Sequence, residues 1–131
     1  WADLIVWFPG ETHEQFLDTL DLVKNYSITK VHAFPFSNHT LWEHVPASFF
    51  PNQIDEKIKK ERLAQLMHIG DVVRNEFITS QKWNTFELLI ENVKDGIFKG
   101  WTENYIECNN KNFEIISGEV KKNEIVLWKL K

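Results

Sequence analysis

The N-terminal residues place an apolar run, a short corner and a helical pattern in that order. Leu4–Phe8 is apolar throughout without helical spacing, and Pro9-Gly10 ends it, which is typical of a buried parallel strand. Thr12 and Gln15 have the spacing of a capping box, so a helix is predicted from Glu11 to about Asn25. A strand that turns through a Gly corner into a helix forms half of a βαβ unit.

A second strand is predicted at Lys30–Phe36, and Pro35 marks its end or a bulge. Strand, helix and strand then form a βαβ unit with a parallel pair and a right-handed crossover. Ligands gather at the ends of such strands, because a helix N-terminus presents unpaired backbone N–H groups there. The irregular Ser37–Asn52 segment follows. It is interpreted either as a cover over the end of the core or as a functional loop.

The pattern next predicts one long helix, Asp55–Gln81, because its apolar residues recur at helical spacing. The charged run at its start, Asp55–Arg62, is interpreted as a solvated face with i,i+4 ion pairs. Gly70, in the middle of the helix, marks close packing or a bend.

Beyond Lys82 the apolar period changes to two, which indicates short strands. Lys94-Asp95-Gly96 is a strong hairpin turn. Strands are predicted at Phe86–Ile90, Ile97–Trp101, Tyr105–Cys108, Phe113–Ile116 and Ile125–Leu130. Such a series predicts a small closed or partly closed β-barrel. A domain boundary is placed near Gln81–Asn84, which divides the chain into 1–82 and 83–131.

Composition and charge narrow the class of protein. The chain has 131 residues, a net charge of -4 and one cysteine, Cys108. This excludes an internal disulfide framework and a Cys-rich metal site, and it indicates a reducing cytoplasm. No apolar run approaches the ~20 residues of a membrane helix. The mildly acidic net charge creates no overall positive field of the kind that indicates nucleic-acid binding. Because the chain lacks an initiator Met and opens on a strand, we expect a fragment of a longer protein.

Four motifs in order carry a resemblance to a known family. They are Asp3-Leu4-Ile5-Val6-Trp7-Phe8-Pro9-Gly10-Glu11-Thr12, His32-Ala33-Phe34-Pro35-Phe36-Ser37, Lys59-Lys60-Glu61-Arg62 and Thr102-Glu103-Asn104-Tyr105-Ile106. Together they resemble the radical S-adenosylmethionine methylthiotransferases, which add a methylthio group to tRNA or to a ribosomal protein. The second and fourth motifs resemble the MtaB-type branch, which acts on threonylcarbamoyladenosine beside the tRNA anticodon.

The resemblance implies an architecture and a division of labour. Residues 1–82 would be the last βα units of a partial TIM-like barrel, and 83–131 a small all-β, OB-like TRAM domain that binds RNA. The full-length parent would use S-adenosylmethionine and two 4Fe-4S clusters held by a Cys-x-x-x-Cys-x-x-Cys motif, which this chain lacks. The fragment alone is expected to bind no cofactor or metal, to hold no catalytic residue and to be inactive. The expected partner is tRNA at its anticodon region, with no membrane and no DNA.

The resemblance also implies site residues. The cofactor contacts would be Phe8, Pro9, Gly10, Glu11, His32, Phe34, Phe36 and Ser37. Considered by itself, Glu11 is equally well a first-turn residue that stabilises its own helix. Phe34 and Phe36 could stack on a purine, but apolar strand residues are more often plain core. The RNA contacts would be Lys99, Trp101, Asn104 and Tyr105. The two aromatic residues of this set either stack on unpaired bases or belong to the core or rim of the barrel.

Two departures from the family pattern stand out. Trp7 occupies a position where the family has glycine, so an indole fills space that a bare backbone would leave open. After Ser37 the family continues with Arg-x-Gly-Thr-Pro, whereas this chain has Asn38–Trp42. His39 and His44 share a loop, but no Cys or cluster of carboxylates completes a metal site there. Two other functions stay open: a ribosomal-protein methylthiotransferase, and a non-catalytic RNA-binding module with an α/β extension.

Overall fold

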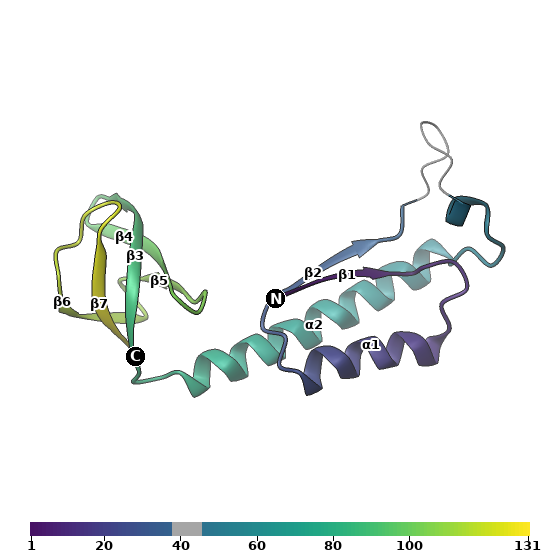
Figure 1. The fold of residues 1–131 in the computed structure, drawn as a ribbon, viewed down its shortest axis with the longest axis horizontal. Helices are drawn as coiled ribbons and strands as arrows, with labels where there is room; N and C mark the ends of the chain where they lie inside the picture. The colour runs from purple at the N-terminus through teal and green to yellow at the C-terminus, as the bar shows by residue number, and fades with distance from the viewer. Residues whose placement is uncertain (38–45) are drawn as a thin grey trace. The chain divides into compact units, whose positions relative to one another are not determined.

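A computed structural model describes residues 1–37 and 46–131 of the chain (Figure 1). Its contacts divide the chain into two compact units, residues 1–77 and 78–131. The predicted boundary near Gln81–Asn84 lies a few residues beyond this division.

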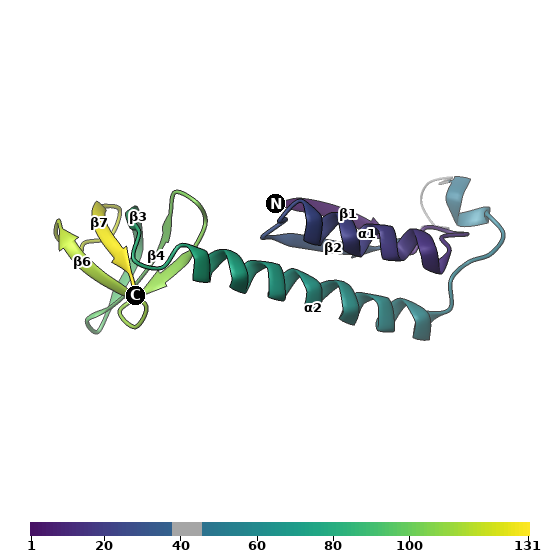
Figure 2. The same ribbon diagram turned by 90° about the horizontal axis from the view of Figure 1, so that it is seen from below.

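The first unit is a βα-type layer. Its elements are β1 (Ala2–Val6), α1 (His13–Asn25), β2 (Val31–Pro35), a 3-10 turn (Pro46–Phe49) and α2 (Glu56–Ser80), whose last residues belong to the second unit. β1 and β2 pair in parallel, as predicted. Both helices run alongside the strand pair in Figures 1 and 2 and share one core with it. The fully buried members of that core are Val6, Trp7, Phe16, Val23, Leu66 and Val73.

The predicted boundaries shift for local reasons. β1 ends at Val6 rather than Phe8, because Trp7 turns the backbone into the left-handed region with φ of 68°. α1 begins at His13 rather than Glu11, because Thr12 is its N-cap and both bonds of the predicted capping box are present. Pro35 does end β2, as its missing N–H requires.

The second unit is a curled five-stranded antiparallel sheet that forms a half-barrel (Figure 1). Its strands are β3 (Thr85–Lys94), β4 (Ile97–Thr102), β5 (Glu107–Asn109), β6 (Phe113–Ser117) and β7 (Ile125–Leu130), in the order β5-β4-β3-β7-β6. This confirms an all-β C-terminal unit of short strands. Buried residues alternate with exposed ones along β3, β4 and β7, so one face of the sheet makes the core.

Turn chemistry sets the curl and the register of this sheet. Asp95 and Gly96 both have positive φ, 52° and 76°, which is the geometry of the predicted tight hairpin. A β-bulge between Ile90 and Asn92 bends β3. A Cβ on Gly100 would lie 2.2 Å from the Leu89 carbonyl oxygen, so glycine is required where these strands approach. β5 begins at Glu107 rather than at the predicted Tyr105, because residues 102–105 form a turn.

Two tryptophans share an unfavourable backbone conformation but not an environment. Trp7 has φ of 68° and Trp83 has φ of 69°. The left-handed region costs an L residue with a bulky side chain about 1–2 kcal/mol. Trp7 is 1% exposed, and burial of its indole in the core offsets that cost. Trp83 is 66% exposed, and among the described residues its ring has Lys129 close by, with Nζ 5.7 Å from the ring centre. A cation–π contact at such a site contributes about 0.5–1 kcal/mol, which does not exceed the backbone cost.

Replacing each tryptophan with glycine tests this contrast. Trp7→Gly should destabilise the first unit by about 3 kcal/mol, because the loss of a buried indole outweighs the relief of the backbone. Trp83→Gly should change the stability of the second unit by less than about 1 kcal/mol, because backbone relief offsets the lost cation–π contact. Urea unfolding followed by assigned amide resonances reports each unit separately. A loss at Trp83→Gly as large as that at Trp7→Gly would contradict this account.

Candidate functional site

The corner between β1 and α1 is built by one local and one long-range backbone hydrogen bond. The Glu11 N–H donates to the Phe8 carbonyl (2.9 Å), and the Gly10 N–H donates to the Asn52 carbonyl (3.0 Å). Gly10 has φ of 86°, and a Cβ added to it would meet no atom within 4 Å. Glycine is therefore required at this position by conformation, and its outer side is open.

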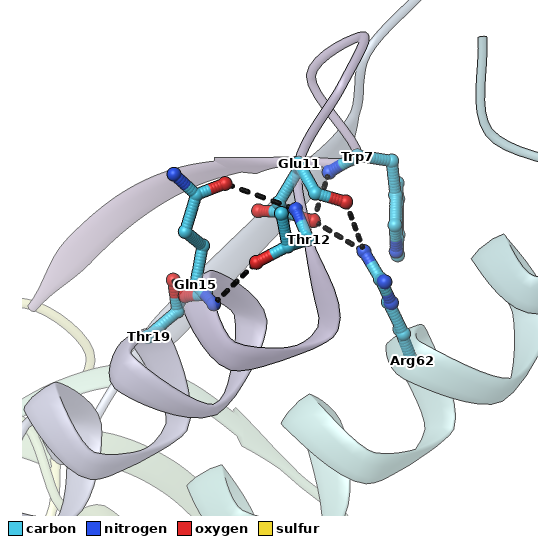
Figure 3. Close-up of polar contacts among 6 residues, drawn as sticks. All are labelled: Trp7, Glu11, Thr12, Gln15, Thr19 and Arg62. Atoms are coloured by element: carbon cyan, nitrogen blue, oxygen red, sulfur yellow. Dashed lines mark hydrogen bonds and ion pairs between the residues drawn. The ribbon is translucent and has the colours of Figure 1, made fainter. Parts of the chain in front are cut away.

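The Glu11 carboxylate holds this corner from the inside (Figure 3). Its Oε2 accepts a hydrogen bond from the Trp7 backbone N–H at 3.1 Å and another from Nη1 of Arg62 at 2.8 Å. The same Nη1 lies 3.4 Å from the Glu11 carbonyl. Two groups that the left-handed turn would otherwise leave unpaired, a peptide N–H and a carbonyl, are thereby satisfied. One carboxylate thus links the end of β1, the start of α1 and the first turns of α2.

Arg62 corrects the interpretation of the Asp55–Arg62 run as a solvated face. Its side chain is 9% exposed and that of Glu11 is 13% exposed, so the pair is mostly desolvated. The guanidinium also lies 5.2 Å from the ring centre of Phe16, while its Nε has no partner among the described residues. The spacing from Arg62 to Leu66 and Val73 places it on the buried face of α2. That spacing is the sequence signal that would have identified it.

An open hollow lies on the outer side of the corner. Its lining comprises Phe8, Pro9, Gly10, Glu11, Gln15 and Thr19. Trp7 is not part of it, because its indole points into the core. The expected intrusion of that indole into the cofactor space is therefore not seen. The remaining lining includes the half-exposed ring of Phe8 and the polar side chains of Gln15 and Thr19, which fits a ligand with a flat apolar group and polar substituents.

Four of the eight predicted cofactor residues line this hollow, and a fifth contacts it. The Phe36 N–H donates to the Val6 carbonyl (3.0 Å), which brings its ring to Phe8 with centroids 5.5 Å apart. Phe50 lies against the other side of Phe8, at 6.0 Å. Both pairs meet edge to face, the favourable aromatic geometry. An aromatic cluster thus forms where β1 and β2 end, and Phe8 at its centre is half-exposed.

The other three predicted cofactor residues lie apart from the hollow. His32 and Phe34 occupy the face of β2 opposite the helices, and His32 Nδ1 lies 3.3 Å from Asp3 Oδ1. Ser37 is exposed and is the last described residue before position 46. Asn38–Trp42, His39 and His44 lie outside the described residues, so the predictions made for them are not tested.

The predicted RNA residues gather around β4 and the turn that follows it. Lys99 is exposed, and half-buried Trp101 donates from its Nε1 to Glu91 Oε2 at 3.1 Å. Tyr105 is largely exposed, with φ of 62°. Asn104 has a structural role, because its Oδ1 accepts a hydrogen bond from the Thr102 hydroxyl within the turn.

Cys108 is an unsuitable metal ligand. It is buried, and burial raises the pKa of its thiol to about 12 from an ordinary 9.0, against a smaller lowering by a backbone hydrogen bond at Thr102. The unfolded thiol ionises first, so folding stability falls as pH rises from about 9 towards 12. In the part of the chain that the structure describes, no three His, Cys, Asp or Glu side chains form a metal-binding group. The same part contains no helix that is long and apolar enough to cross a membrane.

Comparison with known proteins identifies relatives across nearly the whole chain. The threonylcarbamoyladenosine tRNA methylthiotransferase MtaB of Bacillus subtilis is 31% identical over 130 residues, which covers 95% of this chain and 28% of that protein. The tRNA-2-methylthio-N(6)-dimethylallyladenosine synthase of Fusobacterium nucleatum is 37% identical, which covers 98% of this chain and 25% of that protein. The ribosomal protein uS12 methylthiotransferase RimO of Clostridioides difficile is 35% identical over 101 residues, which covers 76% of this chain and 22% of that protein.

The chain therefore spans about a quarter of the length of these relatives. No family model matches it.

The Glu11–Arg62 pair can be tested by a double-mutant cycle. Arg62→Met should destabilise the first unit by about 3 kcal/mol, because it leaves a desolvated carboxylate without its cation. Glu11→Gln should lower the free energy of unfolding by at least about 1 kcal/mol less in the Arg62→Met background than in the wild-type chain. The matched control is Glu56→Gln, which breaks the Lys59–Glu56 pair of the same helix, where the Glu56 side chain is 77% exposed. That control should change stability by less than about 0.5 kcal/mol. Additive effects of Arg62→Met and Glu11→Gln would show that Glu11 and Arg62 are not coupled.

Proposed function

The chain belongs to the methylthiotransferase family, and we propose that its full-length parent adds a methylthio group to threonylcarbamoyladenosine next to the tRNA anticodon. The motifs His32–Ser37 and Thr102–Ile106 support this substrate, because they resemble that branch. The MtaB protein of Bacillus subtilis, named for it, aligns with 95% of the chain, and the dimethylallyladenosine synthase of Fusobacterium nucleatum aligns with 98%. The proposed site of action is the cytoplasm.

The observation that carries the proposal is the hollow at the β1–α1 corner. It lies at the carboxyl ends of a parallel strand pair and beside a helix N-terminus, where α/β folds bind ligands. We assign it to S-adenosylmethionine, which in this family supplies a radical and a methyl group once a cluster is bound. Phe8 and Phe36 offer aromatic surface for the adenine, and Gly10 leaves room for close approach. The Arg62–Glu11 pair fixes the loop that carries these groups.

Iron–sulfur clusters do not fit the described residues, since the only cysteine is a buried thiol whose pKa is raised to about 12. The proposal therefore gives this chain two tasks, a wall of the cofactor pocket and a grip on RNA. The second task is assigned to the half-barrel, where Lys99, Trp101 and Tyr105 lie on or near β4, and where Asn104 shapes the turn. The net charge of the chain is -4, so affinity from phosphate neutralisation alone should be weak.

A deletion strain of the gene for the full-length parent tests the substrate. Mass spectrometry of tRNA nucleosides should show loss of the methylthio form of threonylcarbamoyladenosine and accumulation of the form without it. Methylthio-dimethylallyladenosine and ribosomal protein uS12 should be unchanged. If the strain instead keeps methylthio-threonylcarbamoyladenosine and loses the methylthio group of dimethylallyladenosine or of uS12, the protein belongs to another branch. A strain with all three intact would favour a non-catalytic RNA-binding module. Complementation by the intact gene controls for effects on neighbouring genes.

A further inference from the structure

Trp83 lies in an exposed position at the start of the half-barrel, and its backbone is hydrogen-bonded there. Its backbone N–H donates to the Leu130 carbonyl at 2.8 Å, and the Leu130 N–H donates to the Asn84 carbonyl at 3.1 Å. These bonds extend the pairing between β3 and β7 by one step beyond Thr85 and Lys129. The indole is nevertheless 66% exposed, because the left-handed backbone turns it away from the core. A large flat ring is therefore open to solvent on a backbone that is hydrogen-bonded to β7.

One lysine lies over this ring, and two more lie close to it along the backbone. Lys129 Nζ is 5.7 Å from the ring centre, and Lys82 precedes Trp83 in the chain. Lys131 follows Leu130, whose carbonyl accepts the Trp83 N–H. A carboxylate, Glu114, is paired with Lys129 in the β6–β7 register.

The fold does not account for a tryptophan at this position. Trp7 has the same backbone conformation, and burial of its indole in the core offsets the cost of that conformation. Trp83 gains little from burial, and its contact with Lys129 does not exceed the cost of its backbone, so glycine would serve the fold equally well. An exposed aromatic ring in a positive setting is instead the arrangement that binds single-stranded nucleic acid, with bases stacked on the ring and phosphates near the cations.

We propose that Trp83 and Lys129 form a stacking platform for an unpaired RNA base, with Lys82 and Lys131 close to the neighbouring phosphates. The platform rests on the proposed function, which makes RNA the substrate. It is separate from the predicted contacts on β4. Trp101 pairs with Leu89 of β3, which lies ~13 Å along the strand from Thr85 at about 3.3 Å per residue. RNA that reaches both places must therefore extend along the half-barrel.

The test uses the full 131-residue chain and an anticodon stem–loop RNA at low salt, with a blunt duplex of the same stem as a second probe. Trp83→Ala should weaken binding of the stem–loop by about 5- to 100-fold and leave binding of the duplex unchanged, because only unpaired bases stack on a side chain. Trp83→Tyr should retain most of the affinity. Lys129→Met should weaken binding of both probes and lower the dependence on salt. Trp1→Ala is the matched control, an exposed tryptophan of the other unit at 79% exposure, and it should have no effect.

A second measurement locates the contact. With fluorine-labelled tryptophan, the resonance assigned to Trp83 by its absence in Trp83→Tyr should shift when the stem–loop is added. The platform is overturned if Trp83→Ala binds the stem–loop with wild-type affinity and the Trp83 resonance of the wild-type chain does not shift. This holds even if Trp101→Ala loses binding. Absence of stem–loop binding by the wild-type chain also overturns it, as does an equal loss of stem–loop and duplex affinity in Trp83→Ala. Failure of the proposed function appears elsewhere, as unchanged tRNA nucleosides in the deletion strain.

Discussion

The ion pair between Glu11 and Arg62 is the contact on which the first unit depends. The two residues are 51 positions apart, and both are mostly desolvated. Without Arg62, the carboxylate at the end of β1 would be an unpaired buried charge, which strongly destabilises a fold. Without Glu11, the left-handed turn at Trp7 would leave its N–H without an acceptor. The hollow at the corner exists because this one contact fixes the loop between β1 and α1 against α2.

Backbone conformation explains how one residue type serves two purposes in this chain. At Trp7 a left-handed residue ends the strand, and its indole closes the core beneath the corner. The resemblance places glycine at this position in the family, which agrees with the left-handed backbone. At Trp83 the same conformation turns the ring outward beside Lys129. Packing therefore offsets the cost of this backbone conformation at Trp7. At Trp83 we relate the exposed ring to the binding of a ligand.

Local signals in the sequence predicted most of the elements. The capping box at Thr12, the proline that ends β2 and the hairpin at Asp95-Gly96 are all decided by neighbouring residues, and the structure confirms them. The burial of Arg62 was predicted wrongly, because it depends on a partner far away in the sequence. The positive φ of Trp7 was missed for a related reason, since tertiary packing overrides the conformational preference of tryptophan. At the candidate site, the residues of one loop were predicted as a group, whereas Phe50 and Arg62 came from distant segments.

The central claim is that the corner hollow forms part of the S-adenosylmethionine pocket of the full-length enzyme. The direct measurement is the affinity of the cluster-loaded parent for S-adenosylmethionine, determined by equilibrium dialysis for Phe8→Ala. Leu17→Ala, a half-exposed apolar residue of α1 outside the hollow, serves as the matched control. The account predicts about tenfold weaker binding for Phe8→Ala, about 1.4 kcal/mol, and wild-type binding for Leu17→Ala. Wild-type affinity in a folded, cluster-loaded Phe8→Ala variant would contradict it.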